Sequence, residues 1–193
     1  MLIKTNIASI RFNPFTRIGE DNMLITAGTA KRFNPMTAAW GGLGVLWGRN
    51  AATIYINPAR YTFGFANESN YFTLCFFEPE YHDKLMFCGT HSGRDTDKVK
   101  ECGFTPVSAE CGAVYFAEAS LVFVCKKMYS DDFRQEFILE GYAGPTGPPP
   151  KRIPFREDMP DPTPLLHGPM KLHRFYIGEV LEVLVQKKHK TNK

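Results

Sequence analysis

Three short stretches of the chain bring together the groups that bind phosphate in proteins. Small residues let backbone N–H groups approach a ligand, hydroxyls donate hydrogen bonds to anionic oxygens, and arginine pairs with a phosphate through two parallel bonds. Strand-like segments separate the three stretches, and together they indicate a pocket for a phosphorylated planar cofactor that is not a Rossmann site. The stretches are residues 33–42, 60–62 and 92–95.

The first stretch contains the sequence Asn-Pro-Met-Thr-Ala-Ala-Trp-Gly-Gly after the first predicted core strand. We expect its backbone amides and the Thr37 hydroxyl to face a ligand, Asn34 to hydrogen-bond ring or phosphate oxygens, and Met36 to pack on an aromatic plane. Taken alone, the pattern favours a simpler interpretation, in which an Asn-Pro turn enters a strand and Trp40 belongs to the core.

The second stretch follows a predicted strand across an Asn-Pro turn. Arg60 and Thr62 then combine a charged head with a hydroxyl at the start of a possible helix, an arrangement common in phosphate sites. The alternative of equal weight is an arginine on a solvated rim and a threonine that caps the next helix.

The third stretch, Ser-Gly-Arg-Asp, precedes a predicted helix over residues 95–102. Ser92, Gly93 and Arg94 supply a hydroxyl, a flexible backbone and a cation, and Lys98 follows one turn later. In the alternative interpretation, Asp95 is an ordinary N-cap, and Arg94 and Lys98 are simply exposed.

Other motifs that carry chemistry are absent from the sequence. The run Gly41-Gly42-Leu43-Gly44 lacks the spacing of a dinucleotide-binding loop, and neither a nucleophile elbow nor a phosphate-binding P-loop occurs. Cys88 and His91 are close in sequence but have no evident orienting third group. The five cysteines and five histidines form no metal-spaced cluster, so we expect no metal site.

Composition indicates a globular protein with one domain. The 193 residues are 44% hydrophobic and 13% aromatic, which is enough for a sizeable core. The net charge of +3 depends on four lysines in the last seven residues, so we expect no nucleic-acid partner. No apolar run is long enough to span a bilayer, and the odd number of dispersed cysteines indicates reduced thiols in a cytoplasmic protein.

Hydrophobic patterning predicts a mainly β barrel. Runs of aromatic and β-branched residues predict strands at 22–27, 52–57, 71–77, 113–116, 121–126 and 175–185. Short helices are predicted at 61–70, 83–88, 95–102 and 130–139, the second and third ending at glycines. Nine of the 14 prolines fall within 144–169, which predicts an extended excursion inside a single domain of residues 1–186, followed by a frayed basic tail at 187–193.

In their order along the chain, these motifs resemble the flavin reductase-like family, the group that contains flavoredoxins and other FMN-binding split-barrel proteins. The resemblance runs from about Met23 to Val185, and the order and spacing of the motifs favour the ligand-binding interpretations over the simpler ones. The matching pieces are residues 34–41, 60–62, 92–95 with Lys98, and His173 with 178–180.

The resemblance implies a six-stranded antiparallel split barrel with a few short helices, which forms a homodimer and holds FMN at or near the dimer interface. The Pro-rich excursion is longer and richer in proline than the resemblance leads us to expect, and we expect it to wrap the partner subunit or cover the flavin. His173 would lie near the flavin ring, and Leu172 replaces the acid that often precedes this histidine in the family. The implied cofactor-binding residues are Asn34, Met36, Thr37, Ala38, Ala39, Arg60, Tyr61, Thr62, Ser92, Gly93, Arg94, Asp95 and Lys98.

The activity implied is that of an oxidoreductase, an NAD(P)H-dependent flavin reductase in which NADH or NADPH is a transient hydride donor. The flavin carries the chemistry, so no side chain is assigned as a catalytic residue. Two alternatives stay open. One is a flavoredoxin-like electron carrier with tightly bound FMN, which a redox partner protein reduces. The other is a split barrel that has lost flavin and serves as a dimeric scaffold.

Overall fold

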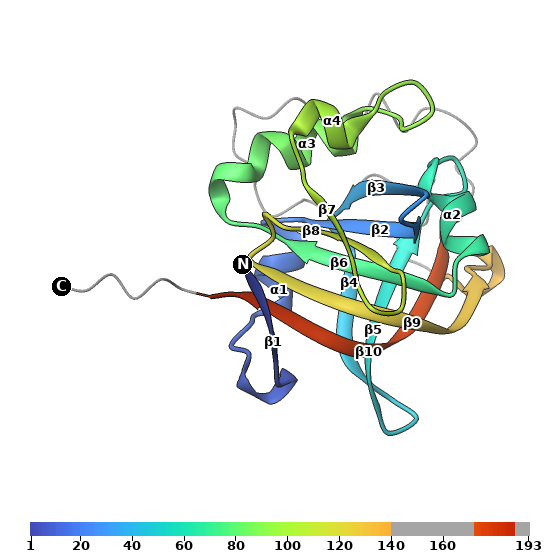
Figure 1. The fold of residues 1–193 in the computed structure, drawn as a ribbon. Coiled ribbons are helices and arrows are strands. Elements are labelled where there is room, and N and C mark those ends of the chain that lie inside the picture. The colour runs from blue at the N-terminus through green and yellow to red at the C-terminus, as the bar shows by residue number, and fades with distance from the viewer. Residues whose placement is uncertain (140–171, 188–193) are drawn as a thin grey trace.

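The computed structural model describes residues 1–139 and 172–187, and in this part of the chain the fold is an antiparallel sheet with four short α-helices (Figure 1). The strands are β1 (Leu2–Thr5), β2 (Met23–Thr29), β3 (Arg32–Ala38), β4 (Gly41–Leu46), β5 (Arg49–Ile56), β6 (Tyr71–Phe76), β7 (Pro106–Ser108), β8 (Val114–Phe116), β9 (Leu121–Asp132) and β10 (Arg174–Gln186). The helices are α1 (Pro14–Gly19), α2 (Thr62–Glu68), α3 (His82–Thr90) and α4 (Lys98–Cys102).

One curved sheet carries most of the fold. Its strand order is β3-β2-β6-β9-β10-β5-β4, with β1 added to β10, and all pairs are antiparallel. Strand β10 pairs with β5 through its first half and with β1 through its last residues, and register shifts interrupt its ladder with β9 at Ile177/Gly178 and Val180/Glu182. Such bulges bend a strand, which allows β10 to belong to both halves of a split barrel.

The two faces of the sheet bury separate apolar clusters. On β2, Met23 and Ile25 belong to the barrel interior, whereas Leu24 packs into the cluster beneath the helices, as the twofold periodicity of a strand requires. Helices α3 and α4 lie side by side over the end of the sheet formed by β3 and β2 (Figure 1). Strand β3 is therefore the edge strand of the sheet, and helix α3 covers one of its faces.

The prediction of a mainly β antiparallel split barrel with a few short helices is confirmed, although the main sheet has eight strands where six were expected. All six predicted strands are present. The patterning did not indicate β1, β4 or β7, and it placed a turn before a strand where β3 already includes Asn34 and Pro35. The predicted helix at 130–139 is wrong. Residues Ser130, Asp131 and Asp132 continue β9 and pair with β10, and only a 3-10 turn follows at Gln135–Phe137. Cross-strand pairing here prevails over the local signal of a serine N-cap.

Three boundaries differ from those predicted, and all three matter for the site. Helix α3 does not stop at the predicted Gly89 but continues through it to Thr90. Asn34 and Pro35 lie inside β3 rather than in a turn, and Pro35 is tolerated because β3 is an edge strand. Helix α4 starts at Lys98 with Asp97 as its N-cap, so the Ser-Gly-Arg-Asp stretch is a turn that lies before the helix. Gly103 ends α4 with φ of +61°, as predicted.

Some expectations fall on residues outside the described part of the chain. These are the Pro-rich excursion at 144–169 and the basic tail beyond Lys187. Among the described residues, no helix has the length and apolarity required to cross a membrane.

Candidate functional site

The structure brings the first two phosphate-type stretches together at Gly89 on α3, and the third contacts the first at Gly93. The Arg60 guanidinium donates from Nη1 to the Gly89 carbonyl at 3.0 Å. The Cα of Gly89 faces Thr37 so closely that an added Cβ would lie 3.3 Å from the Thr37 Cβ. Residues far apart in sequence, on β3, after β5 and on α3, therefore share one end of the sheet.

Asn34 and Thr62 join β3 to α2 through their side chains. Asn34 donates from Nδ2 to the Thr62 hydroxyl at 2.7 Å and to the Pro35 carbonyl at 3.1 Å. Their exposed fractions are only 5% and 1%. Because a buried amide needs partners, this pair fixes the edge strand against the helix. Because both side chains are buried, they brace the wall of the site and are not exposed to a ligand.

The third stretch touches the same wall through Gly93. A Cβ at this position would lie 1.9 Å from the Asn34 Oδ1 and 3.0 Å from a ring carbon of Tyr61. Contacts this short do not occur, so only glycine lets the turn approach Asn34 and Tyr61. The Ser-Gly-Arg-Asp turn is thereby held against β3 and the start of α2.

Lys98 is the most deeply buried cation near the site. Its Nζ donates to the carbonyls of Pro35 and Cys88, at 3.2 Å for Cys88. Burial lowers its pKa, the neighbouring thiol of Cys88 raises it, and the positive charge of Arg60 lowers it further. The resemblance assigned Lys98 to a phosphate grip, but its ammonium is already bonded to two protein carbonyls, which makes it a link between α4, α3 and β3.

Arg60 and His173 form the second side of the site. Burial lowers the pKa of the Arg60 guanidinium, which remains a cation at neutral pH. Burial, and then the positive charge of Arg60, lower the pKa of His173 and favour the neutral imidazole. The Trp40 ring lies 5.1 Å from the His173 ring and is 57% exposed, so the alternative that placed Trp40 in the core is wrong.

Arg94 and Ser92 supply groups that solvent can reach. Arg94 is exposed, donates from Nη1 to the Ala59 carbonyl at 3.2 Å, and places its guanidinium 5.2 Å from the centre of the Tyr61 ring. The Ser92 Oγ accepts the backbone N–H of Arg94 at 3.2 Å, which leaves its hydroxyl proton available to a ligand.

The predicted site residues thus divide by accessibility. Buried residues shape and brace the wall, whereas accessible ones can touch a ligand. The buried residues are Asn34, Met36, Ala38, Thr62 and Lys98, and the accessible ones are Thr37, Ala39, Arg60, Tyr61, Ser92, Gly93, Arg94 and Asp95.

The sequence did not reveal the carbonyl groups that hold the site together. Thr37 donates its hydroxyl proton to the Leu85 carbonyl, and the carbonyls of Cys88 and Gly89 receive Lys98 and Arg60. All three acceptors are backbone groups of α3. Since any residue type carries a carbonyl, no side-chain pattern could have identified them.

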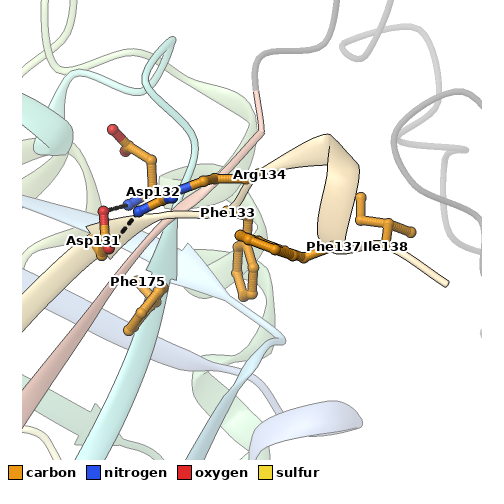
Figure 2. Close-up of a pocket in the computed structure, with 7 residues that line it drawn as sticks. All are labelled: Asp131, Asp132, Phe133, Arg134, Phe137, Ile138 and Phe175. Carbon is orange, nitrogen blue, oxygen red and sulfur yellow. Dashed lines mark hydrogen bonds and ion pairs between the residues drawn. The ribbon is translucent and has the colours of Figure 1, made fainter.

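A separate aromatic surface lies at the end of β9, beside the site. Phe133, Phe137 and Phe175 line a pocket of about 250 Å³ there, and an ion pair joins Arg134 to Asp131 at 3.6 Å (Figure 2). The backbone N–H of Phe133 donates to the His173 carbonyl at 3.0 Å, so this surface is continuous with the histidine next to Arg60.

Replacement of Lys98 by methionine tests its structural role. We expect the Lys98→Met substitution to lower the free energy of unfolding by about 1–3 kcal/mol, because two buried carbonyls lose a charged donor. The measurement is urea unfolding of the cofactor-free protein followed by tryptophan fluorescence. Lys100→Met is the matched control, since Lys100 is an exposed lysine on the same helix. Equal stability of the two variants would contradict a bracing role for Lys98.

Comparison with solved structures places the chain among split-barrel proteins. A flavoredoxin from Methanosarcina acetivorans superposes with a TM-score of 0.62 at 18% identity, over 86% of this chain and 69% of that one. An FMN-binding protein from Thermus thermophilus gives 0.58 at 16% identity, over 84% and 69%. An NADH:FAD oxidoreductase from Streptomyces globisporus gives 0.56 at 14% identity, over 86% and 75%. These likenesses establish the fold.

Comparison with curated proteins finds no match. The sequence model of the flavin reductase like domain, in contrast, matches residues 15–192, which is nearly the whole chain and includes all three phosphate-type stretches. The chain therefore belongs to the flavin reductase-like domain family.

Proposed function

We propose that this protein binds FMN and passes hydride from NADH or NADPH to the flavin. One observation carries the proposal. Arg60, Arg94 and Lys98 gather at one end of the sheet, and each donates to a neutral backbone carbonyl. Among the described residues, none of the three forms an ion pair with a carboxylate. The site therefore keeps cations that no carboxylate pairs with directly, which favours a bound anion.

The chemistry of the accessible groups fits the phosphate of FMN. A phosphate carries nearly two negative charges at neutral pH, and arginine matches it with two parallel hydrogen bonds. Arg60 and Arg94 provide two guanidinium groups, and Ser92 provides a hydroxyl proton. The names of the similar solved proteins, one FMN-binding and one an NADH:FAD oxidoreductase, support this choice of ligand.

In this proposal the residues of the chain bind, orient and exclude water. FMN, when bound, supplies the ring that accepts hydride. Arg60 and Arg94 hold the phosphate with charge-assisted bonds of about 1.5–3 kcal/mol each. Strand β3 ends the sheet, so its outer edge offers backbone N–H and carbonyl groups to a planar ring. The neutral imidazole of His173 and the exposed Trp40 ring border the same space.

We also propose that the protein is a homodimer with FMN at or near the interface. Support comes from the aromatic surface next to His173, where large apolar side chains are exposed. Phe133 is 44% exposed, Phe137 71% and Leu139 72%. Monomeric proteins rarely expose a contiguous apolar patch of this kind. Phe133 is hydrogen-bonded to His173, and His173 is close enough to Arg60 to feel its charge. A second copy packed on this surface would therefore lie near Arg60.

The first experiment is an absorption spectrum followed by nicotinamide addition. We expect the purified protein to be yellow, and anaerobic NADH or NADPH to bleach the flavin absorbance, because a reductase takes hydride directly. A protein that bleaches with dithionite but with neither nicotinamide would be an electron carrier and not a reductase. A protein that binds no FMN on reconstitution would refute both functions.

Loss of the two guanidinium groups tests the phosphate assignment. We expect Arg60→Ala combined with Arg94→Ala to weaken FMN binding by about 3–6 kcal/mol, since two charge-assisted contacts are lost. FMN fluorescence titration after dialysis gives the dissociation constant. Arg49→Ala is the control, because Arg49 pairs with Glu179 at the opposite end of β5. Wild-type FMN occupancy in the double variant would show that the phosphate binds elsewhere.

The dimer proposal is tested at the aromatic surface. Replacement of Phe133 and Phe137 by serine should produce a monomer in size-exclusion chromatography with light scattering, because the interface loses its apolar anchors. Leu181→Ser, at a residue that is 41% exposed on β10, serves as the control outside this surface. A wild-type protein that is already monomeric would refute the proposal.

A further inference from the structure

A second cavity opens at the Asn34–Gly93 contact, and both residues line it. It measures about 670 Å³ and lies between the β2–β3 turn, the start of α2 and the chain from residue 93 to 100. Thr37, Arg60 and His173 do not line it, whereas six residues assigned to the flavin site do: Asn34, Tyr61, Gly93, Arg94, Asp95 and Lys98. The cavity, here called the basic cleft, is therefore a neighbour of the proposed flavin site and shares a wall with it.

Positive charge is concentrated in the basic cleft. Five cationic side chains and two carboxylates line it, which gives a formal charge of +3, whereas the chain without the four lysines of its last seven residues carries −1. The cations are Lys31, Arg32, Arg94, Lys98 and Lys100, and the carboxylates are Asp95 and Asp97.

Two of these cations have no partner among residues 1–139 and 172–187. Within the described residues, the exposed ammonium groups of Lys31 and Lys100 make no hydrogen bond or ion pair, whereas Arg32 lies 3.6 Å from Glu68. The Asp97 carboxylate accepts the backbone N–H of Lys100 as the N-cap of α4 and forms no ion pair with either lysine within the described residues. The cleft thus offers two free ammonium groups to an anion.

Aromatic and guanidinium planes line the same cleft. Arg94 lies 5.2 Å from the centre of the Tyr61 ring, and Arg32 lies 4.8 Å from that of Phe65. A guanidinium plane supported on one side by an aromatic ring can stack a planar base on its other side. Stacking planes beside free ammonium groups are the chemistry that recognises a nucleotide with its phosphate.

We propose that the basic cleft binds the adenosine-phosphate half of the nicotinamide dinucleotide. This inference rests on the proposed function, because a dinucleotide that places nicotinamide at the flavin must place its second nucleotide nearby. Asn34, Gly93 and Tyr61 line the cleft and also belong to the residues assigned to the flavin site, so the two sites are adjacent. Lys31 and Lys100 are assigned to the phosphate, and Arg94 to both sites.

The test uses the FMN-loaded protein and AMP as the probe. AMP binding is measured by saturation-transfer NMR titration, and the Michaelis constant for NADPH by flavin bleaching. We expect Lys31→Ala combined with Lys100→Ala to weaken AMP binding and to raise the Michaelis constant at least about fivefold, because two phosphate contacts are lost. The maximal bleaching rate and FMN affinity should not change.

Lys4→Ala combined with Lys126→Ala is the matched control, since it removes the same charge from the exposed surfaces of β1 and β9. An equal loss of AMP binding in this control would reduce the effect to long-range charge and overturn the proposal. The proposal would also be overturned if the wild-type protein did not bind AMP. Loss of FMN from the cleft variant would overturn it too, because that result would assign the cleft to the phosphate of FMN. AMP binding that depends on Lys31 and Lys100 without nicotinamide bleaching would support a nucleotide cleft and refute the reductase function.

Discussion

The ammonium group of Lys98 lies in the interior, between α4, which carries it, and the backbone of β3 and α3. A buried charge is costly unless hydrogen bonds replace its water, and here the carbonyls of Pro35 and Cys88 do so. The Pro35 carbonyl also accepts the amide of Asn34, which in turn bonds to Thr62. A single carbonyl on the edge strand thus receives donors that connect α4 and α2 to the sheet.

This arrangement explains why the site is cationic and remains so. Lys98, Arg60 and Arg94 are held by neutral carbonyls rather than by carboxylates, so the hydrogen bonds orient the cations without cancelling their charge. Burial lowers the pKa of both Lys98 and Arg60, which indicates an unfavourable environment for positive charge. In our proposal a bound dianion would relieve this cost, which would couple ligand binding to the stability of this end of the sheet.

The sequence predicted the strands best where the pairing is continuous and apolar, as in β6, and least well where the pattern is mixed. Strand β3 begins with Arg32 and contains Asn34 and Pro35, so its residues indicated a turn. The end of β9 indicated a helix, because Ser130 is a good N-cap and the pairing with β10 comes from a segment more than forty residues away. In both cases a distant partner strand decided the outcome.

The residue types by themselves predicted a phosphate-binding site, because guanidinium and hydroxyl groups occur next to small residues in three separate stretches. They also determined the family, since the motifs occur in its order. Only the tertiary structure decided which of these groups can reach a ligand. Asn34, Thr62 and Lys98 carry the right chemistry, but packing buries them and pairs them with one another or with carbonyls. Burial and backbone acceptors depend on how the elements meet, and no local pattern of side chains specifies that.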